Sequence, residues 1–309
     1  MAINKAVHAA LKALSYPDPD VEATYKVERQ VKTLAGRLRA VSPFYQIWDR
    51  EIRCGDHAVP VRIFAPPDTS PHPVLLFFHG GGWVVGNIDS YTGVCLDMVR
   101  QTGQIVVSVD YRLAPEFPFP AGLEDCYAVL QEICRNGGPL GSRMCDLTVI
   151  GDSAGGNLAA AVSLLSRDRG EFLPPRQILL YPATYCDHTP DSPFASVVEN
   201  GTDYLLTSKR VEEFMTLYQS DPSDRQSPYF APLLAKDFSH QPRTLVITAE
   251  FCPLRDEGEA FGERLWEAGN KVKIFRIKDA LHGYFSLPAR FPQVAHTYDL
   301  INRFLTEQM

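Results

Sequence analysis

The strongest constraint on the fold is a series of short β-branched and apolar runs, separated by stretches with helical spacing. Runs this apolar suit strands that are covered on both faces, which is typical of a parallel sheet with helices above and below it. The runs lie at residues 61–66, 73–80, 104–111, 147–152, 177–183, 244–250 and 272–277. The spacing predicts helices at 119–136, 153–167, 256–269 and 291–306. This alternation indicates an α/β fold with a mostly parallel sheet.

Other segments depart from that alternation. The runs at 48–54 and 58–65 leave little room for a crossover helix, so they predict an antiparallel hairpin at the start of the sheet. Residues 1–45 look helical, and 184–230 form a long insertion interrupted by prolines. Long insertions between core strands are often functional lids, so we expect this one to lie near a site.

Composition narrows the class of partner. A chain of 309 residues with 45 % hydrophobic content can bury a sizeable core, and we expect one folding unit. The net charge of −7, without any run of Lys and Arg, argues against nucleic acid or an acidic membrane surface and favours a small molecule. No apolar stretch has the length of a signal or a membrane span. Seven cysteines without metal-site spacing predict reduced thiols, a cytoplasmic location and no metal.

Three short motifs carry chemistry. "GDSAGG" (151–156) follows a predicted strand and precedes a predicted helix, the context in which a sharp turn exposes a serine nucleophile, here Ser153. The bland interpretation of this motif is a simple helix N-cap. "HGGGW" (79–83) ends another strand, and its glycines let the amides of Gly81 and Gly82 join that of Ala154 around one oxygen. The motif fits neither nucleotide-binding glycine pattern.

The third motif, "ALHGYF" (280–285), places His282 in a loop after the last predicted strand. A lone histidine would more often be a capping residue. Its position after Ser153 and after an acidic stretch near 252 gives the order serine, acid, histidine, which is the chain order of the α/β-hydrolase fold.

Six segments in this order resemble the hormone-sensitive-lipase-like family of bacterial carboxylesterases, which includes acetyl esterases. They are "HGGGW", "DYRLAPEFPFPAGLEDCYA", "GDSAGGNLA", "SPYFAPLLA", "PLRDEGEAF" and "LHGYF", and the likeness runs from about residue 45 to the end. The resemblance implies an α/β-hydrolase domain at 46–309 and a helical cap. The cap would combine an N-terminal segment, 1–45, with the insertion at about 184–230. No cofactor is implied.

The resemblance also implies roles for individual residues. Ser153 would be the nucleophile, His282 the base, and Gly81, Gly82 and Ala154 the oxyanion donors. We expect Trp83, Tyr204 and Phe285 to wall the substrate pocket. We expect Asp110, Arg112 and Glu116 to form a buried polar network under the "HGGGW" loop, because buried charges need partners.

The catalytic acid departs from the family pattern, because Cys252 stands where the family has an aspartate directly before "PL". A neutral thiol cannot stabilise the imidazolium that forms when His282 takes the serine proton. Glu250 is our first choice as substitute, since alternate side chains along a strand point to the same side. Asp256 is the second choice. A Cys252 thiolate is the third, and it needs a strongly depressed pKa.

The sequence therefore predicts a cytoplasmic, cofactor-independent carboxylesterase that cleaves small or short-acyl esters through an acyl-serine intermediate. Two alternatives stay open. A hydrolase fold with an incomplete triad can serve as a non-catalytic small-molecule binder, and an amidase or formamidase could use the same nucleophile and oxyanion donors. A homodimer is left open as the oligomeric state.

Overall fold

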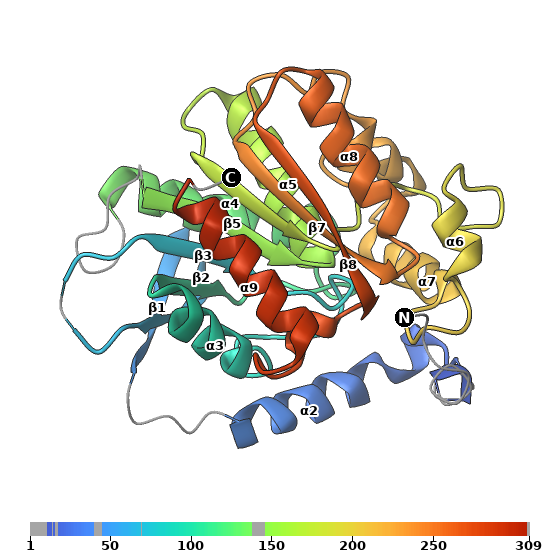
Figure 1. Ribbon diagram of the computed structural model, residues 1–309, viewed down its shortest axis with the longest axis horizontal. Coiled ribbons are helices and arrows are strands. Elements are labelled where there is room, and N and C mark those ends of the chain that lie inside the picture. The colour runs from blue at the N-terminus through green and yellow to red at the C-terminus, as the bar shows by residue number, and fades with distance from the viewer. Residues whose placement is uncertain are drawn as a thin grey trace.

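The fold is built on one twisted, mostly parallel sheet (Figure 1). The computed structural model describes residues 11–13, 15, 18–39, 45–68, 70–137 and 146–307. Within these ranges eight strands pair in the order β1-β2-β4-β3-β5-β6-β7-β8, with β1 and β2 antiparallel to their neighbours and the others parallel. The strands are β1 (Gln46–Cys54), β2 (His57–Ala65), β3 (Val74–Phe78), β4 (Ile105–Val109), β5 (Leu147–Asp152), β6 (Arg176–Leu180), β7 (Arg243–Phe251) and β8 (Val272–Leu281). The expected hairpin and the expected parallel strands are confirmed.

Helices cover both faces of the sheet, which explains why its central strands are mostly apolar. Every residue of β3, β4 and β5 is buried. Helices α3 (Thr92–Thr102) and α9 (Pro292–Leu305) pack together on one face. Helices α4 (Ala121–Asn136), α5 (Ala154–Arg169) and α8 (Arg255–Glu267) cover the other. The sequence had predicted all of these except α3. None of the helices in the described ranges is both long and apolar enough to cross a membrane.

A separate helical layer lies beside the carboxyl ends of the parallel strands (Figure 1). It consists of α2 (Val21–Arg39), α6 (Ala195–Glu199) and α7 (Ser208–Tyr218). Arg29 ties α2 to the sheet domain, since its guanidinium donates to the Val84 carbonyl at 2.7 Å and to Glu116 at 2.9 Å. The helical character expected for 1–45 is thus found at α2, while residues 1–10 and 40–44 lie outside the described residues.

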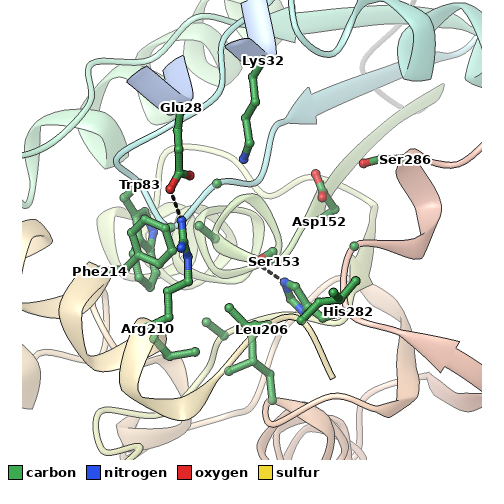
Figure 2. A pocket seen from close by; sticks show the side chains of 18 of the residues that line it. Glu28, Lys32, Trp83, Asp152, Ser153, Leu206, Arg210, Phe214, His282 and Ser286 are labelled. Carbon is green, nitrogen blue, oxygen red and sulfur yellow. Dashed lines mark hydrogen bonds and ion pairs between the residues drawn. The ribbon is translucent and has the colours of Figure 1, made fainter. Parts of the chain in front are cut away.

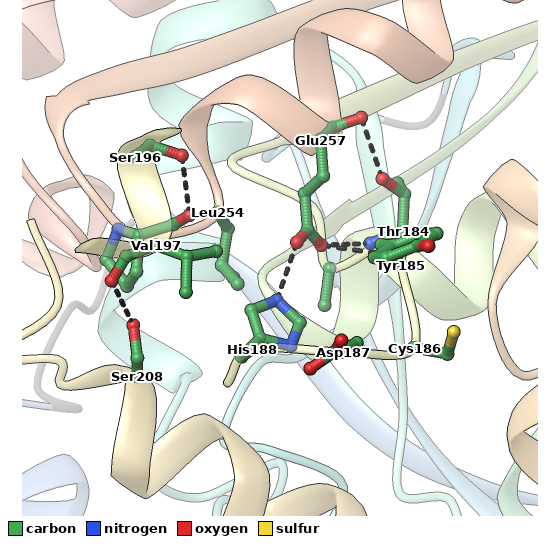
Figure 3. Close-up of polar contacts among 12 residues, drawn as sticks. Thr184, Tyr185, Cys186, Asp187, His188, Ser196, Val197, Ser208, Leu254 and Glu257 are labelled. Atoms are coloured by element: carbon green, nitrogen blue, oxygen red, sulfur yellow. Dashed lines mark hydrogen bonds and ion pairs between the residues drawn. The ribbon is translucent and has the colours of Figure 1, made fainter. Parts of the chain in front are cut away.

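A buried pair joins the insertion to the sheet domain at α8 (Figure 3). His188 and Glu257 are both fully enclosed, and His188 Nε2 lies 2.6 Å from Glu257 Oε2. The other carboxylate oxygen of Glu257 accepts from the backbone amides of Thr184 and Tyr185 at 2.6 and 3.2 Å. A nearby bond, from the Ser196 hydroxyl to the Pro253 carbonyl at 2.8 Å, holds α6 against the same region. The insertion therefore leaves the core at a buried polar junction.

The polar network expected from "DYRLAPE" is wrong as a single buried cluster. Asp110 accepts from the amide of Ile88, which follows the "HGGGW" loop, at 3.2 Å. Arg112 instead binds Asp125 of α4 at 2.8 Å, and Glu116 is exposed and pairs with Arg29 of α2. The three side chains diverge because each finds an opposite charge or a donor on a different element, which the local sequence does not contain.

Candidate active site

A strained turn between β5 and α5 presents Ser153. This residue has φ 56° and ψ −119°, a backbone conformation rare for a residue with a side chain. The turn needs a glycine two positions later, because a Cβ at Gly155 would lie 1.9 Å from the Phe78 carbonyl oxygen of the neighbouring strand. The strand, turn and helix expected from "GDSAGG" are therefore present, and Ser153 lines a pocket.

His282 reaches this serine from the loop directly after β8. Its Nε2 lies 2.9 Å from Ser153 Oγ (Figure 2), which is hydrogen-bonding distance for a base and its nucleophile. The Tyr181 ring meets the imidazole edge to face, with ring centroids 4.9 Å apart, and fixes its plane. The structure thus brings together two residues separated by 129 positions, as the sequence motifs predicted.

The glycine loop lies on the other side of Ser153. Gly81 and Gly82, with φ values of 123° and 60°, line the same pocket as Ala154. A Cβ at Gly81 would lie 2.0 Å from the Val85 carbonyl oxygen, so no other residue fits there. In the part of the chain that the structure describes, no loop or turn hydrogen bond uses the Gly81 or Gly82 amide as its donor. These amides are placed to meet an oxyanion.

Asp152, the residue before the nucleophile, supports this loop. Its carboxylate accepts from the Gly80 amide at 2.8 Å and from the Tyr91 hydroxyl at 3.1 Å. Burial raises the pKa of Asp152 to about 6, although these two hydrogen bonds act in the opposite direction. The serine turn and the glycine loop are therefore held in register by one buried carboxyl group.

Cys252 occupies the position of the acid beside His282. Its Sγ lies 3.1 Å from His282 Nδ1 and also accepts from the Leu254 amide at 3.4 Å. The side chain is fully buried, and this burial raises the pKa of the thiol far above its ordinary value. Cys252 is accordingly a neutral thiol at physiological pH. The thiolate alternative is wrong, because the depressed pKa that it requires is absent.

Glu250, our first choice for the acid, does not contact His282, and that prediction is wrong. Its Oε2 accepts from the Asp279 amide of β8 at 2.7 Å. The alternation argument failed because β7 ends at Phe251 and its pairing with β8 is irregular between Ala249 and Phe251. The bulge gives Asp279 a φ of 56° and turns its amide toward Glu250.

Asp256, the second choice, is also engaged elsewhere. One carboxylate oxygen accepts from the Ser196 amide at 2.8 Å and the other from Arg255 Nε at 2.7 Å. These contacts tie the start of α8 to α6. The partner of His282 Nδ1 is therefore the thiol of Cys252 and not the carboxylate of Asp256. Among the described residues, no carboxylate forms a hydrogen bond or an ion pair with His282.

The thiol changes the proton arrangement of His282. A carboxylate only accepts, so it forces the proton onto Nδ1 and leaves Nε2 free to act as a base. A thiol can donate or accept, and Cys252 already accepts from Leu254, so its own hydrogen is free to point at Nδ1. When the thiol donates to Nδ1, Nε2 carries the ring proton and cannot act as the base, so only the tautomer with its proton on Nδ1, pointing at the sulfur, is reactive. Burial, with the charge of Lys32, also lowers the pKa of His282 to about 3.

The pocket over Ser153 has a volume of about 270 Å³, at the small end of ligand sites. Trp83 lines it, as expected, and stacks on Tyr218 with ring centroids 4.5 Å apart. Tyr204 and Phe285 do not line it, and that prediction is wrong. Tyr204 stacks on Phe251 at 4.9 Å, and Phe285 packs against Tyr298 at 5.0 Å. The rings of Tyr204 and Phe285 each pack against another aromatic ring and do not face the pocket.

The helical layer supplies lining residues that the sequence did not reveal. Glu28 and Lys32 enter from α2, and Arg210 enters from α7, where it forms an ion pair with Glu28 (Figure 2). The apolar residues Leu205 and Leu206 complete this side. The helical character expected for 1–45 accounts for the helix that carries Glu28 and Lys32, but only the packing of α2 against α7 places them in the pocket beside Ser153.

One cluster away from this pocket has the residue types of a metal site. Ligand atoms of Cys54, His57 and Asp125 all lie within 4.8 Å of one another. The Asp125 oxygens already bind the Arg112 guanidinium at 2.8 Å and His57 Nε2 at 2.7 Å. A divalent cation would have to sit against the Arg112 charge, so these residues do not fit a metal ion.

Fold and pocket together define an α/β hydrolase, and comparison with known proteins agrees. A family model described as the alpha/beta hydrolase fold matches residues 75–286. An arylesterase of Saccharolobus solfataricus is 34 % identical over 87 % of both chains. The ethyl acetate hydrolase of Pseudomonas putida is 35 % identical over 75 % of this chain and 73 % of its own.

Solved structures narrow the class further. A hyperthermophilic esterase of Pyrobaculum calidifontis superimposes with a TM-score of 0.89 at 33 % identity and covers 100 % of this chain and 99 % of its own. A thermostable esterase of Pseudomonas putida has the same TM-score at 30 % identity, over 98 % and 97 % of the two chains. This chain belongs to the hormone-sensitive-lipase-like carboxylesterases and is a carboxylic ester hydrolase.

Proposed function

We propose that Ser153 and His282 hydrolyse small carboxylic esters through an acyl-serine intermediate. The observation that carries the proposal is the 2.9 Å contact between Ser153 Oγ and His282 Nε2, in a pocket also lined by Gly81, Gly82 and Ala154. A nucleophile, its base and converging amides are the parts that acyl transfer requires. No cofactor enters this chemistry.

The first half of the reaction forms the acyl-enzyme. Ser153 Oγ attacks the ester carbonyl carbon while its proton passes to His282 Nε2. The carbonyl oxygen becomes an oxyanion and accepts from the amides of Gly81, Gly82 and Ala154. The tetrahedral intermediate then breaks its bond to the alcohol oxygen, which leaves with the proton from His282.

The second half releases the acid. A water molecule gives one proton to His282 Nε2, and its oxygen attacks the acyl carbon. The bond to Ser153 Oγ breaks, and that oxygen takes the proton back from His282. In both halves the neutral Cys252 stabilises the imidazolium less than a carboxylate would, so we expect proton transfer to limit the rate.

The pocket size favours short acyl groups. A volume of about 270 Å³ leaves room for a small acyl chain and a small alcohol rather than a long fatty chain. Two relatives named arylesterase and ethyl acetate hydrolase support this size class for the present chain. We accordingly place the substrate among small or short-acyl esters.

The site also favours ester cleavage over amide cleavage and over binding without catalysis. An amide has a less reactive carbonyl and a poorer leaving group, so it depends more on a well-stabilised imidazolium, which Cys252 does not provide. A pure binder would not need the strained Ser153 or the open amides of the glycine loop, since backbone strain of this kind costs about 1–3 kcal/mol. The intact nucleophile and loop favour an active esterase.

The decisive experiment compares wild type with Ser153→Ala on a series of p-nitrophenyl esters from acetate to octanoate. We expect turnover that declines with chain length in wild type and none above background in the variant. Ser70→Ala, at an exposed serine outside the pocket, is the control for handling and folding. Intact-mass measurement should show the acyl group on Ser153. Folded wild type that binds esters without turnover would establish the receptor alternative.

Three further expectations belong to the same proposal. The layer of α2, α6 and α7 would serve as the cap over the pocket, with boundaries near 1–45 and 184–230 of the sequence. A cytoplasmic location fits cysteines that remain unpaired at all six described positions. A homodimer stays open as the oligomeric state, and light scattering of the purified chain decides it.

A further inference from the structure

We propose that Lys32 forms an anion subsite in the catalytic pocket, so that the preferred substrates are small esters that also carry a carboxylate. This inference rests on the proposed esterase function and deepens it by naming the substrate class. Its basis is the charge arrangement of the pocket wall contributed by α2 and α7.

The charges that line the pocket are not all paired with one another. Arg210 and Glu28 form an ion pair across α7 and α2, and Arg210 also lies over the Phe214 ring at 5.4 Å. Asp152 accepts from the Gly80 amide and the Tyr91 hydroxyl. For Lys32, the contacts among the described residues include no hydrogen bond and no ion pair. One positive charge in the pocket thus lacks a direct partner.

Lys32 is directed at the reacting residues. Figure 2 shows its ammonium extending from α2 into the space above Ser153, between Glu28 and Asp152. The residue keeps an exposed surface within this open pocket, and burial of its ammonium lowers the pKa of Lys32, while the charge of Glu28 acts in the opposite direction. Burial is the larger cause of the lowered pKa of His282, and the charge of Lys32 adds to it, so Lys32 acts electrostatically on the catalytic histidine.

The rest of the wall is apolar, with Leu205, Leu206, Val211 and Leu254 around the serine. An unpaired ammonium in such surroundings binds a carboxylate more strongly than it would on an open surface, because less water competes for it. A neutral ester offers that ammonium no charge, so only the charges of Glu28 and Asp152 attract it, without a direct contact. Discrimination between a carboxylate and its neutral counterpart is therefore the function that this geometry supports.

The test uses pairs of esters that differ only in charge. Monoethyl glutarate and the ethyl ester of glutaric acid monoamide have the same shape, and 3-acetoxybenzoate and 3-acetoxybenzamide form a second pair. The first pair carries the charge on the acyl side and the second on the alcohol side, so the two arms show which part of the substrate faces Lys32. Values of kcat/KM are measured by titration of released acid at low ionic strength.

We expect wild type to prefer the anionic member of at least one pair, and Lys32→Met to reduce that preference about tenfold, the effect of losing one hydrogen bond to a charged group. Lys32→Arg should retain most of the preference. The matched control is Lys26→Met, which removes the same charge from the same helix at a residue outside the pocket lining. Added salt should weaken the preference in wild type and Lys26→Met alike.

The outcomes separate this inference from the proposed function. If wild type hydrolyses the neutral members and Lys32→Met leaves the charge preference unchanged, the subsite is refuted and the esterase function stands. An equal loss on both members of each pair would also refute it, because Lys32 would then act through His282 and not through substrate charge. If no ester of any kind is hydrolysed, the proposed function itself fails.

Discussion

Replacing Cys252 by aspartate should increase the catalytic rate, because the present enzyme works with a neutral thiol at the acid position. The new carboxylate would have two donors already in place, His282 Nδ1 at 3.1 Å and the Leu254 amide at 3.4 Å from the present sulfur. Toward Nδ1 the carboxylate could accept but never donate, so it would fix the tautomer in which Nε2 is the base.

The magnitude follows from the charge on the imidazolium. Two unit charges about 4 Å apart interact by about 4 kcal/mol at an effective dielectric constant of about 20, which corresponds to roughly 10³-fold in rate. Loss of the acid in other serine hydrolases costs roughly 10⁴-fold, which sets the upper limit. The thiol already orients the ring, so we expect kcat to rise roughly 10²- to 10³-fold. Burying the carboxylate should lower the unfolding free energy by about 1–3 kcal/mol.

The assay measures kcat and kcat/KM on p-nitrophenyl acetate between pH 4 and 9, with thermal unfolding in parallel. Burial lowers the pKa of His282 to about 3 in wild type, so the acid limb of the wild-type rate lies below the assayed pH range, whereas an ordinary histidine titrates at about 6.5. The negative charge of an aspartate should raise the pKa of His282. The fall in rate at low pH should then begin at a higher pH, because protonated His282 cannot act as a base. Cys252→Asn, which matches aspartate in shape without its charge, should gain less than tenfold.

Two results would refute this reasoning. If Cys252→Asp folds but kcat does not rise, the imidazolium charge does not limit the rate. If Cys252→Asn gains as much as Cys252→Asp, orientation of the ring and not charge is the limiting factor. Asp152 has a pKa of about 6 and remains in every variant, so a limb near pH 6 that no substitution moves belongs to that residue.

Three other changes test separate parts of the structure. Glu250→Gln should leave kcat within about threefold, because its remaining carbonyl oxygen still accepts from the backbone of β8; a large loss of rate would restore Glu250 as the acid. Gly81→Ala should lower kcat by roughly 10²- to 10³-fold, since the Cβ collides with the Val85 carbonyl and displaces the oxyanion amides; unchanged kcat would exclude this loop from the reaction. Burial disfavours charge on His188, but Glu257 and neighbouring acids outweigh it and raise the pKa of His188, so its stabilisation is complete below about pH 6.5 and is lost as pH rises through the raised value. Thermal unfolding against pH should show this slope in wild type and not in His188→Gln, and identical slopes would contradict it.

The sequence by itself determined the sheet, the order of the motifs and the serine and histidine of the site. Strands such as β3 to β5 can be predicted from the sequence because a strand covered on both faces is mostly apolar. Ser153 and the glycine loop can be predicted from the sequence because their turns admit few residue types. Local backbone chemistry dictates all of these features, so local sequence reveals them.

The tertiary structure alone decided the neighbours of His282 and the walls of the pocket. Whether Glu250 reaches the imidazole depends on where β7 ends and on a bulge in β8, and neither follows from alternation along one strand. Lys32 faces Ser153 only because α2 packs against α7, which lies far along the chain. Contacts between distant segments depend on how whole helices and strands pack together. The pattern of side chains along one helix or strand does not predict that packing.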